Sequence, residues 1–171
     1  CGMYDVAGDS TREGTVGLMT LASKQIKVQY NDVSNVKTGQ QGYDACGIDI
    51  DWSSYQCEVS YNTVYNNDGA GIETMVNENN VIAYNTLYGN GKGSTNTSQS
   101  QICLIGFEGD PAAGRANSVS NLLIKENYLR IPDIAGHTGI KTMINNQATG
   151  GQWLNNTVEN NRFVMEGSNG S

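Results

Sequence analysis

The segment Val59-Ser60-Tyr61-Asn62-Thr63-Val64 places a short alternation of apolar and polar residues on each side of a Tyr-Asn pair. Four other segments repeat this pattern imperfectly: Val28-Gln29-Tyr30-Asn31-Asp32-Val33, Ile82-Ala83-Tyr84-Asn85-Thr86-Leu87, Ile124-Lys125-Glu126-Asn127-Tyr128-Leu129 and Val158-Glu159-Asn160-Asn161-Arg162-Phe163. The aligned asparagines are 31, 23, 42 and 34 residues apart. A unit of two short strands cannot bury its own apolar residues and must stack on copies of itself. The sequence therefore predicts a solenoid.

A second pattern, in which a glycine opens a short strand, precedes the first along the chain. Its copies are Gly17-Leu18-Met19, Gly47-Ile48-Asp49-Ile50-Asp51, Gly71-Ile72-Glu73-Thr74-Met75 and Gly139-Ile140-Lys141-Thr142-Met143. Short strands that follow one another in a constant order, separated by Gly, Asn and Asp turns, are typical of a parallel β-helix. We therefore expect an all-β fold, a parallel β-helix (β-solenoid) of about five to six coils. An antiparallel sandwich or barrel is the structural alternative.

The repeats predict a single β-helix domain over residues 1–171, interrupted by three longer loops. The loops are expected near residues 89–100, 109–118 and 131–139. Long loops in a compact repeat array are commonly functional, so they should flank any groove. The chain begins at Cys1 rather than Met, and its pattern contains no capping helix. We therefore expect a matured product or a piece of a longer solenoid.

The charge of the chain argues against two classes of partner. The net charge is −7 and the isoelectric point is about 4.5. Nucleic acids and anionic membrane surfaces attract clustered Lys and Arg, which this sequence does not contain. It also has no apolar run near the roughly 18 residues of a membrane helix. We therefore expect neither nucleic acid nor a membrane as a partner.

The four cysteines, Cys1, Cys46, Cys57 and Cys103, allow three full disulfide pairings, among which the sequence does not choose. A local Cys46–Cys57 bridge and buried free thiols are both open. Because no Cys-x-x-Cys pair occurs, the spacing argues against a zinc site. Asn-x-Ser/Thr sequons occur at Asn96, Asn155 and Asn169, and their glycosylation depends on the source of the protein.

Alternation along the strands predicts which side chains face the interior. Ile48 and Ile50 should point inward and stack over Ile72 and Ile140, while Asp49 points outward and lies over Glu73. The asparagines of the first pattern should form a column at a turn, with their amides hydrogen-bonded to the coils above and below. We interpret this ladder as structural.

The outward column is the candidate site. It contains Asp49, Asp51 and Glu73, with Glu108 and Lys141 further along. Equivalent residues on adjacent strands lie about 4.8 Å apart, and carboxylates at that distance raise one another's pKa, as a general acid requires. Two carboxyl groups about 5 to 5.5 Å apart suit a retaining glycosidase, and about 6.5 to 9.5 Å an inverting one. The sequence leaves the stereochemistry open, and a solvated, inert acidic strip is the alternative.

Other residues near this column could bind substrate. Trp52 and Tyr55 flank the Asp51 strand and offer aromatic faces to a sugar ring, although Trp52 could simply be half-buried. His137 lies close to Lys141 in sequence, and Arg115 lies in one of the long loops. The acidic cluster could instead hold Ca²⁺, with Lys141 or Arg115 beside a uronic acid as base or charge neutraliser. No metal or cofactor is firmly implied.

The stretch from Gly47-Ile48-Asp49-Ile50-Asp51 through the Tyr61-Asn62 turn and the Asn67-Asp68-Gly69 turn to Glu73 resembles secreted microbial right-handed parallel β-helix proteins of the pectin-lyase-like group. The resemblance covers residues 16–90 and extends more weakly to about residue 164. It implies a right-handed β-helix, and the group includes polysaccharide lyases, glycoside hydrolases, epimerases and proteins without a known reaction. The basic pairs of pectate lyases and the aspartate trio of polygalacturonases are missing. Only Asp49, Asp51 and Glu73 carry over, as an acidic site.

These observations predict a secreted protein that acts on or binds a polysaccharide. The first hypothesis is a glycoside hydrolase that uses Asp49 and Glu73, with Asp51 as modulator or alternative acid. The second is a non-catalytic solenoid that binds glycans or associates end to end through exposed parallel edges. The third is a Ca²⁺-dependent polysaccharide lyase.

Overall fold

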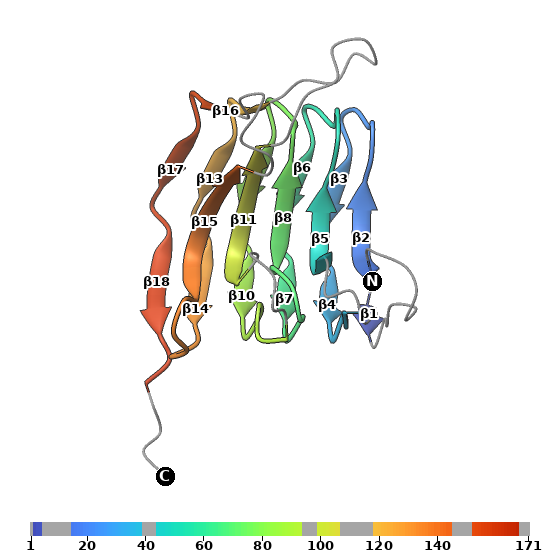
Figure 1. Ribbon diagram of the computed structural model, residues 1–171. Coiled ribbons are helices and arrows are strands. Elements are labelled where there is room, and N and C mark those ends of the chain that lie inside the picture. Colours follow the sequence, from blue (N-terminus) through green and yellow to red (C-terminus); the bar gives the residue numbers. More distant parts are fainter. Residues whose placement is uncertain are drawn as a thin grey trace.

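The computed structural model describes residues 2–4, 15–38, 44–93, 99–106, 118–144 and 152–167. All the strand pairs in this part of the chain are parallel. Parallel pairing excludes the antiparallel sandwich or barrel and confirms the β-helix. Figure 1 shows the strands side by side along one axis, in the order of the sequence.

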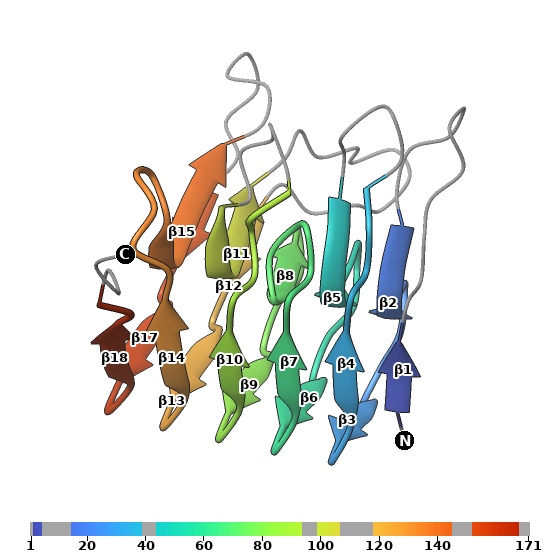
Figure 2. The same cartoon turned by 90° about the horizontal axis from the view of Figure 1, so that it is seen from below.

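Three main sheets run along this axis. The first, seen in Figure 2, contains β1 (Gly2–Tyr4), β4 (Asp32–Ser34), β7 (Thr63–Tyr65), β10 (Thr86–Tyr88), β14 (Tyr128–Ile131) and β18 (Arg162–Met165). The second contains β3 (Lys27–Gln29), β6 (Glu58–Ser60), β9 (Val81–Ala83), β13 (Leu123–Lys125) and β17 (Thr157–Glu159). The third, which we call the β5 sheet, contains β2 (Thr15–Thr20), β5 (Asp44–Ile50), β8 (Ile72–Met75), β11 (Ser100–Gly106) and β15 (Thr138–Ile144).

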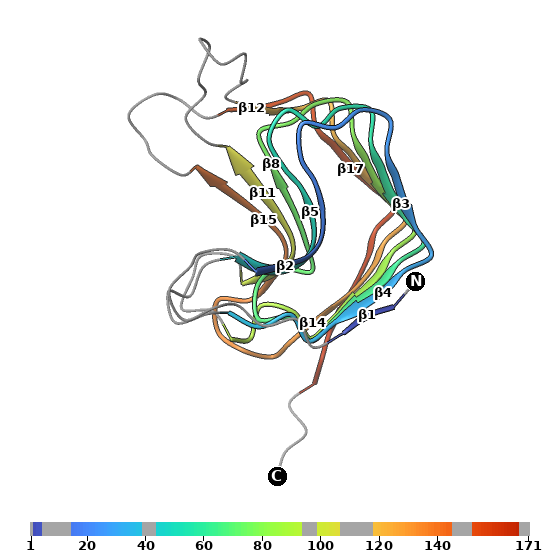
Figure 3. The same cartoon turned by 90° about the vertical axis from the view of Figure 1, so that its right-hand side faces the viewer.

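Each turn of the β-helix contributes one strand to each main sheet, always in the order β5 sheet, second sheet, first sheet. The last two turns add β12 (Ser118–Ser120) and β16 (Gln152–Leu154), which pair with each other. Viewed along the axis in Figure 3, the three sheets lie on different sides of a common interior. The described residues therefore form five successive turns, within the expected number.

The interior is filled by columns of aliphatic residues, one residue from each turn. Ile48, Ile72, Ile102 and Ile140 lie in register across β5, β8, β11 and β15. Val59, Ile82 and Ile124 form the column of the second sheet, and Val64, Leu87 and Leu129 that of the first. All of these except Ile140 are completely buried. The predicted stacking of Ile48 over Ile72 and Ile140 is therefore confirmed.

Asparagine side chains connect the turns at the bend between the second and first sheets. Asn31 donates from its backbone N–H and its Nδ2 to Oδ1 of Asn62, at 2.9 and 3.0 Å. The same two bonds join Asn62 to Asn85, Asn85 to Asn127 and Asn127 to Asn161. Each buried amide thus takes part in hydrogen bonds with both neighbouring turns, which satisfies polar groups that burial would otherwise leave unpaired.

The residue before each of these asparagines adopts a left-handed backbone conformation. The φ angles of Tyr30, Tyr61 and Tyr84 are 56°, 58° and 58°. Non-glycine residues rarely adopt this conformation unless the surrounding structure enforces it. Here the three tyrosine rings stack on one another outside the bend, at centroid distances of 5.2 and 5.0 Å. Ring stacking therefore helps to stabilise a turn that the backbone alone disfavours.

The glycines of the second sequence pattern have a steric role in the β5 sheet, although Gly17 and Gly47 lie inside their strands and do not open them as predicted. A Cβ atom at Gly17 would lie 2.5 Å from the carbonyl oxygen of Gly47, and one at Gly71 would lie 2.8 Å from that of Gln101. Glycine therefore allows the backbone of one turn to pass close to the backbone of the next.

Candidate functional site

One row of side chains crosses the outer side of the β5 sheet. Strand register places Met19, Asp49, Glu73, Cys103 and Lys141 in line, one from each turn. The predicted position of Asp49 directly beside Glu73 is confirmed, and Lys141 lies in the same row. The position that continues the row on β11 is a cysteine, Cys103, between Glu73 and Lys141.

The two acidic residues of this row and the nearby Asp51 are buried. Asp49 is 3% exposed, Glu73 is 2% exposed and Asp51 is 9% exposed. The expectation that these carboxyl groups face solvent is wrong. Cys46, Ala70, Cys103 and Ile105 form a second apolar cluster, with Val16, Met75 and Met143 packed against it. The outer side of the β5 sheet is therefore partly apolar, and its carboxyl groups are held among apolar atoms.

Cys46 joins this group because the alternation along β5 is interrupted. A Cβ atom at Gly47 would point at Val64 of the interior, and the next residue, Ile48, also belongs to the interior cluster. Two consecutive residues thus face inward, so Cys46 and Asp49 both face outward. Strict alternation from Asp49 would have placed Cys46 inside. Gly47, in the middle of β5, was the sequence signal for this interruption.

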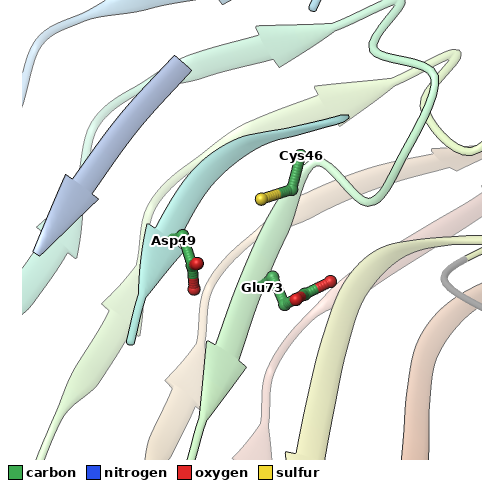
Figure 4. Close-up of side chains that lie close together, drawn as sticks. All are labelled: Cys46, Asp49 and Glu73. Carbon is green, nitrogen blue, oxygen red and sulfur yellow. The ribbon is translucent and has the colours of Figure 1, made fainter. Parts of the chain in front are cut away.

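The three donor groups of Cys46, Asp49 and Glu73 lie close together. One atom from each, the thiol sulfur and two carboxyl oxygens, can be chosen so that all three lie within 4.8 Å of one another. Figure 4 shows these side chains, with Asp49 on β5 and Glu73 on the neighbouring β8. Asp49 Oδ1 is buried and has no hydrogen-bond partner among the described residues.

Burial and mutual repulsion raise the pKa values of the whole cluster. Removal from water raises the pKa of Glu73 from 4.5 to about 8, with further contributions from the charges of Asp44 and Asp51. The pKa of Asp49 is raised well above its usual value, first by burial and then by the charge of Glu73. Burial, followed by the charges of Asp49 and Glu73, also raises the pKa of the Cys46 thiol. Glu73 is therefore largely protonated at neutral pH, and the raised pKa of Asp49 favours the protonated state of that group as well.

Asp51 has a different environment at the end of the strand. Its Oδ1 accepts a hydrogen bond from the backbone N–H of Trp52 at 2.7 Å, and its own N–H donates to the carbonyl of Thr20. The carboxylate thus orders the turn that follows β5. It also contributes negative charge to the cluster, since it raises the pKa values of Asp49 and Glu73.

The other predicted site residues that the structure describes do not belong to this row. Trp52 is half-buried in the turn after β5. Tyr55 lies in a separate row with Lys24 and Glu78, and the Lys24 ammonium is 5.3 Å from its ring centroid. His137 has its Nε2 2.9 Å from the carbonyl oxygen of Gly91, so it ties the 131–139 loop to that segment. Glu108 and Arg115 lie outside the described residues.

Cys46, Cys57 and Cys103 are buried free thiols, so no local Cys46–Cys57 bridge forms. Cys1 lies outside the described residues. The Cys103 sulfur is 3.5 Å from the sulfur of Met143, on the side of the row toward Lys141.

Comparison with known proteins places the chain in a family. The profile described as "Right handed beta helix region" matches residues 5–108, which is more than half of the chain. The chain belongs to the right-handed β-helix family. The handedness that the resemblance implied is therefore confirmed along with the fold.

Among solved structures, the β-helix protein is similar to the A-module of a mannuronan C-5 epimerase from Azotobacter vinelandii. The sequence identity is 12% and the TM-score is 0.40, over 96% of this chain and 55% of that chain. This chain therefore spans about half the length of that module. No curated protein matches the chain in sequence. In the part of the chain that the structure describes, no helix is long and apolar enough to cross a membrane.

The row of this β-helix protein can do two kinds of chemistry. Two neighbouring carboxyl groups with raised pKa values can donate a proton in one ionisation state and accept one in the other. The same carboxyl oxygens, joined by the Cys46 sulfur, can also surround a cation. Both possibilities depend on residues that successive turns bring into register.

Proposed function

We propose that this protein acts on a polysaccharide outside the cell and that its reaction is hydrolysis of a glycosidic bond. The observation that carries the proposal is the in-register pair of buried carboxyl groups, Asp49 and Glu73, on the outer side of the β5 sheet. The resemblance to pectin-lyase-like β-helices supports a polysaccharide as substrate, by analogy of fold. Trp52, in the turn after β5, and Lys141, in the same row as the pair, are the glycan contacts in this proposal.

The short separation of the two carboxyl groups favours a retaining mechanism. Their nearest chosen oxygens lie within 4.8 Å, and retaining glycosidases place their carboxyl groups about 5 to 5.5 Å apart. In the proposed reaction the ionised form of Glu73, which is the minor form at pH 7 because its pKa is about 8, attacks the anomeric carbon while Asp49 gives its proton to the departing oxygen. Asp49 then takes a proton from water, and the hydroxyl oxygen of that water displaces Glu73. Because both groups are nearly covered, the side chains above them must move when the glycan binds.

Removing either carboxyl group should abolish most of this activity. We expect Asp49→Asn and Glu73→Gln each to lower the rate of hydrolysis at least about 100-fold, since general acid catalysis contributes about 10² to 10⁴. The measurement is the release of reducing ends from a panel of neutral and uronic polysaccharides, with the anomeric form of the first product followed by proton NMR. Glu78→Gln, which changes an exposed carboxylate outside the row, is the matched control.

Three results would contradict the proposal: unchanged activity in both variants, an inverted first product, or no cleavage of any panel member. Unsaturated products that absorb in the ultraviolet would instead support the Ca²⁺-dependent lyase. In that case activity should disappear with a chelator and return with Ca²⁺.

A non-catalytic, self-associating solenoid is the second candidate, and the last described turn favours it. Val158 and Phe163 continue the interior columns of the second and first sheets. They are 52% and 49% exposed, whereas Ile124 and Leu129, their neighbours in the preceding turn, are fully buried. Exposed apolar side chains at a parallel edge favour the addition of a further turn, either from the same chain or from another copy. We propose that a second copy of the chain can supply that turn.

A charged residue introduced into the exposed last turn should prevent end-to-end association of the chain. We expect wild-type protein to sediment increasingly as dimers or longer assemblies when its concentration is raised, and Val158→Glu to remain monomeric. Glu78→Lys, which changes the charge of an exposed residue between β8 and β9, two turns before the exposed end, is the control. Sedimentation velocity measures the outcome. A monomeric wild type, or a Val158→Glu variant that associates equally well, would remove this candidate.

A further inference from the structure

The cluster of Cys46, Asp49 and Glu73 has the geometry of a three-ligand metal site. A thiolate and a carboxylate bound to one tetrahedral zinc ion lie about 3.6 Å apart, given Zn–S near 2.3 Å and Zn–O near 2.1 Å. The three donor atoms already lie within 4.8 Å of one another. Small rotations of the side chains would therefore bring them to bonding distance.

A second observation points to a ligand at the same place. Asp49 is 3% exposed, its Oδ1 has no hydrogen-bond partner within the described part of the chain, and donor atoms of Cys46 and Glu73 lie within 4.8 Å of one of its carboxyl oxygens. A buried carboxyl oxygen without a partner is costly, since its interactions with water have been lost without replacement. A bound cation would compensate for that loss.

The charges around the cluster also favour a cation. Asp44 and Asp51 are close enough for their charges to act on Glu73. The positively charged residue of the row, Lys141, is separated from Glu73 by Cys103. The potential at the three donor atoms is therefore negative, which attracts a divalent ion.

We propose that Cys46, Asp49 and Glu73 bind a divalent transition metal ion of the zinc class. The donor set decides the class, because a thiolate is a poor ligand for Ca²⁺, which takes six to eight oxygens, whereas one sulfur and two carboxylates suit Zn²⁺ or Co²⁺. Two neighbouring turns supply the set, so the metal would link β5 to β8. The argument against a zinc site from cysteine spacing applies only to sites built from Cys-x-x-Cys pairs. It does not apply to a site of one thiol and two carboxyl groups.

The inference goes beyond the proposed hydrolysis and does not depend on it. A bound ion displaces the protons of the thiol and both carboxyl groups. The metal-bound form could not use Asp49 as an acid, so metal binding would inhibit the proposed reaction rather than assist it. Binding itself is measured without any substrate.

Cobalt titration of the reduced full chain tests the site directly. We expect one equivalent of Co²⁺ to bind with a thiolate-to-cobalt charge-transfer band in the near ultraviolet, and one equivalent of Zn²⁺ to abolish that band. Cys46→Ser should lose the band and bind at least about 100-fold more weakly, because loss of even an outer partner of a ligand costs 10- to 100-fold. Cys57→Ser, which changes another buried free thiol, should behave as wild type.

Absence of cobalt binding, a band that survives in Cys46→Ser, or a band that disappears in Cys57→Ser would overturn the proposal. Circular dichroism establishes whether Cys46→Ser is folded. If it is not, Asp49→Asn decides the matter, because it keeps the thiol. We expect this variant to retain the band at saturating Co²⁺ with about 100-fold weaker affinity, and an unchanged affinity would be contrary to the proposed ligand set. Neither result depends on hydrolytic activity, so failure of the metal site and failure of the proposed function are distinguishable.

Discussion

Glu73→Gln is expected to stabilise the metal-free protein increasingly as pH rises, by about 5 kcal/mol more at about pH 9 than at about pH 4. The reason is that folding raises the pKa of Glu73 from 4.5 to about 8. Between these values the folded protein binds more protons than the unfolded chain, so the free energy of unfolding falls as pH rises. Below both pKa values the folded and unfolded forms each hold the Glu73 proton, so this group does not change the free energy of unfolding with pH. Above both values each form has lost the proton, and the free energy of unfolding falls no further. Glutamine is neutral throughout and does not suffer this loss.

Urea unfolding of the wild type and Glu73→Gln across this pH range, with a chelator present, measures the difference. Glu78→Gln is the control, because its side chain is exposed. A stability difference between Glu73→Gln and wild type that stays constant with pH would contradict the raised pKa. The removal of the Glu73 charge should also reduce the repulsion on Asp49, which strengthens the effect in the same direction.

Asn85→Ala is expected to destabilise the fold by about 4 kcal/mol, since an unpaired buried polar group costs about 1 to 3 kcal/mol. The Asn85 side chain is 1% exposed and makes four hydrogen bonds. Its Oδ1 accepts from the backbone N–H and Nδ2 of Asn62, and its Nδ2 donates to the carbonyl of Val59 and to Oδ1 of Asn127. Alanine would leave these partners buried without bonds and would leave a cavity between turns.

Chemical denaturation of Asn85→Ala and Asn31→Ala separates the ladder from a general effect of losing an asparagine. Asn31 lies at one end of the ladder, is only partly buried and donates to Asn62 from one side. We expect its replacement to cost about 1 kcal/mol, as for a typical hydrogen bond. Equal losses at the two positions would show that the ladder does not stabilise the fold through buried hydrogen bonds.

The fold could be predicted because its determinants are local and repeated. The alternation around each Asn fixes which residues face the interior, and the glycines allow close passage of successive backbones. Together they set the register, so the neighbouring positions of Asp49 and Glu73 followed from the alignment of Gly47 with Gly71. The same reasoning placed Lys141 in the row.

The burial of the site could not be predicted in this way. Alternation shows on which side of a strand a residue lies, but it does not show what covers that side. The environment of Asp49 and Glu73 depends on Ala70, Cys103 and Ile105, which come from other turns of the chain. The outer position of Cys46 depends on two consecutive inward-facing residues, Gly47 and Ile48, which interrupt the alternation.

The pKa of Glu73 in the folded, metal-free protein tests the central claim most directly, because it reports both the burial of the carboxyl pair and its ability to hold a proton. Carbon-13 NMR of the labelled side-chain carboxyl, assigned with Glu73→Gln, follows its titration. The structure predicts a midpoint near pH 8. A midpoint near the ordinary value of about 4.3 for glutamate would show that Glu73 is solvated and would contradict the buried acid pair.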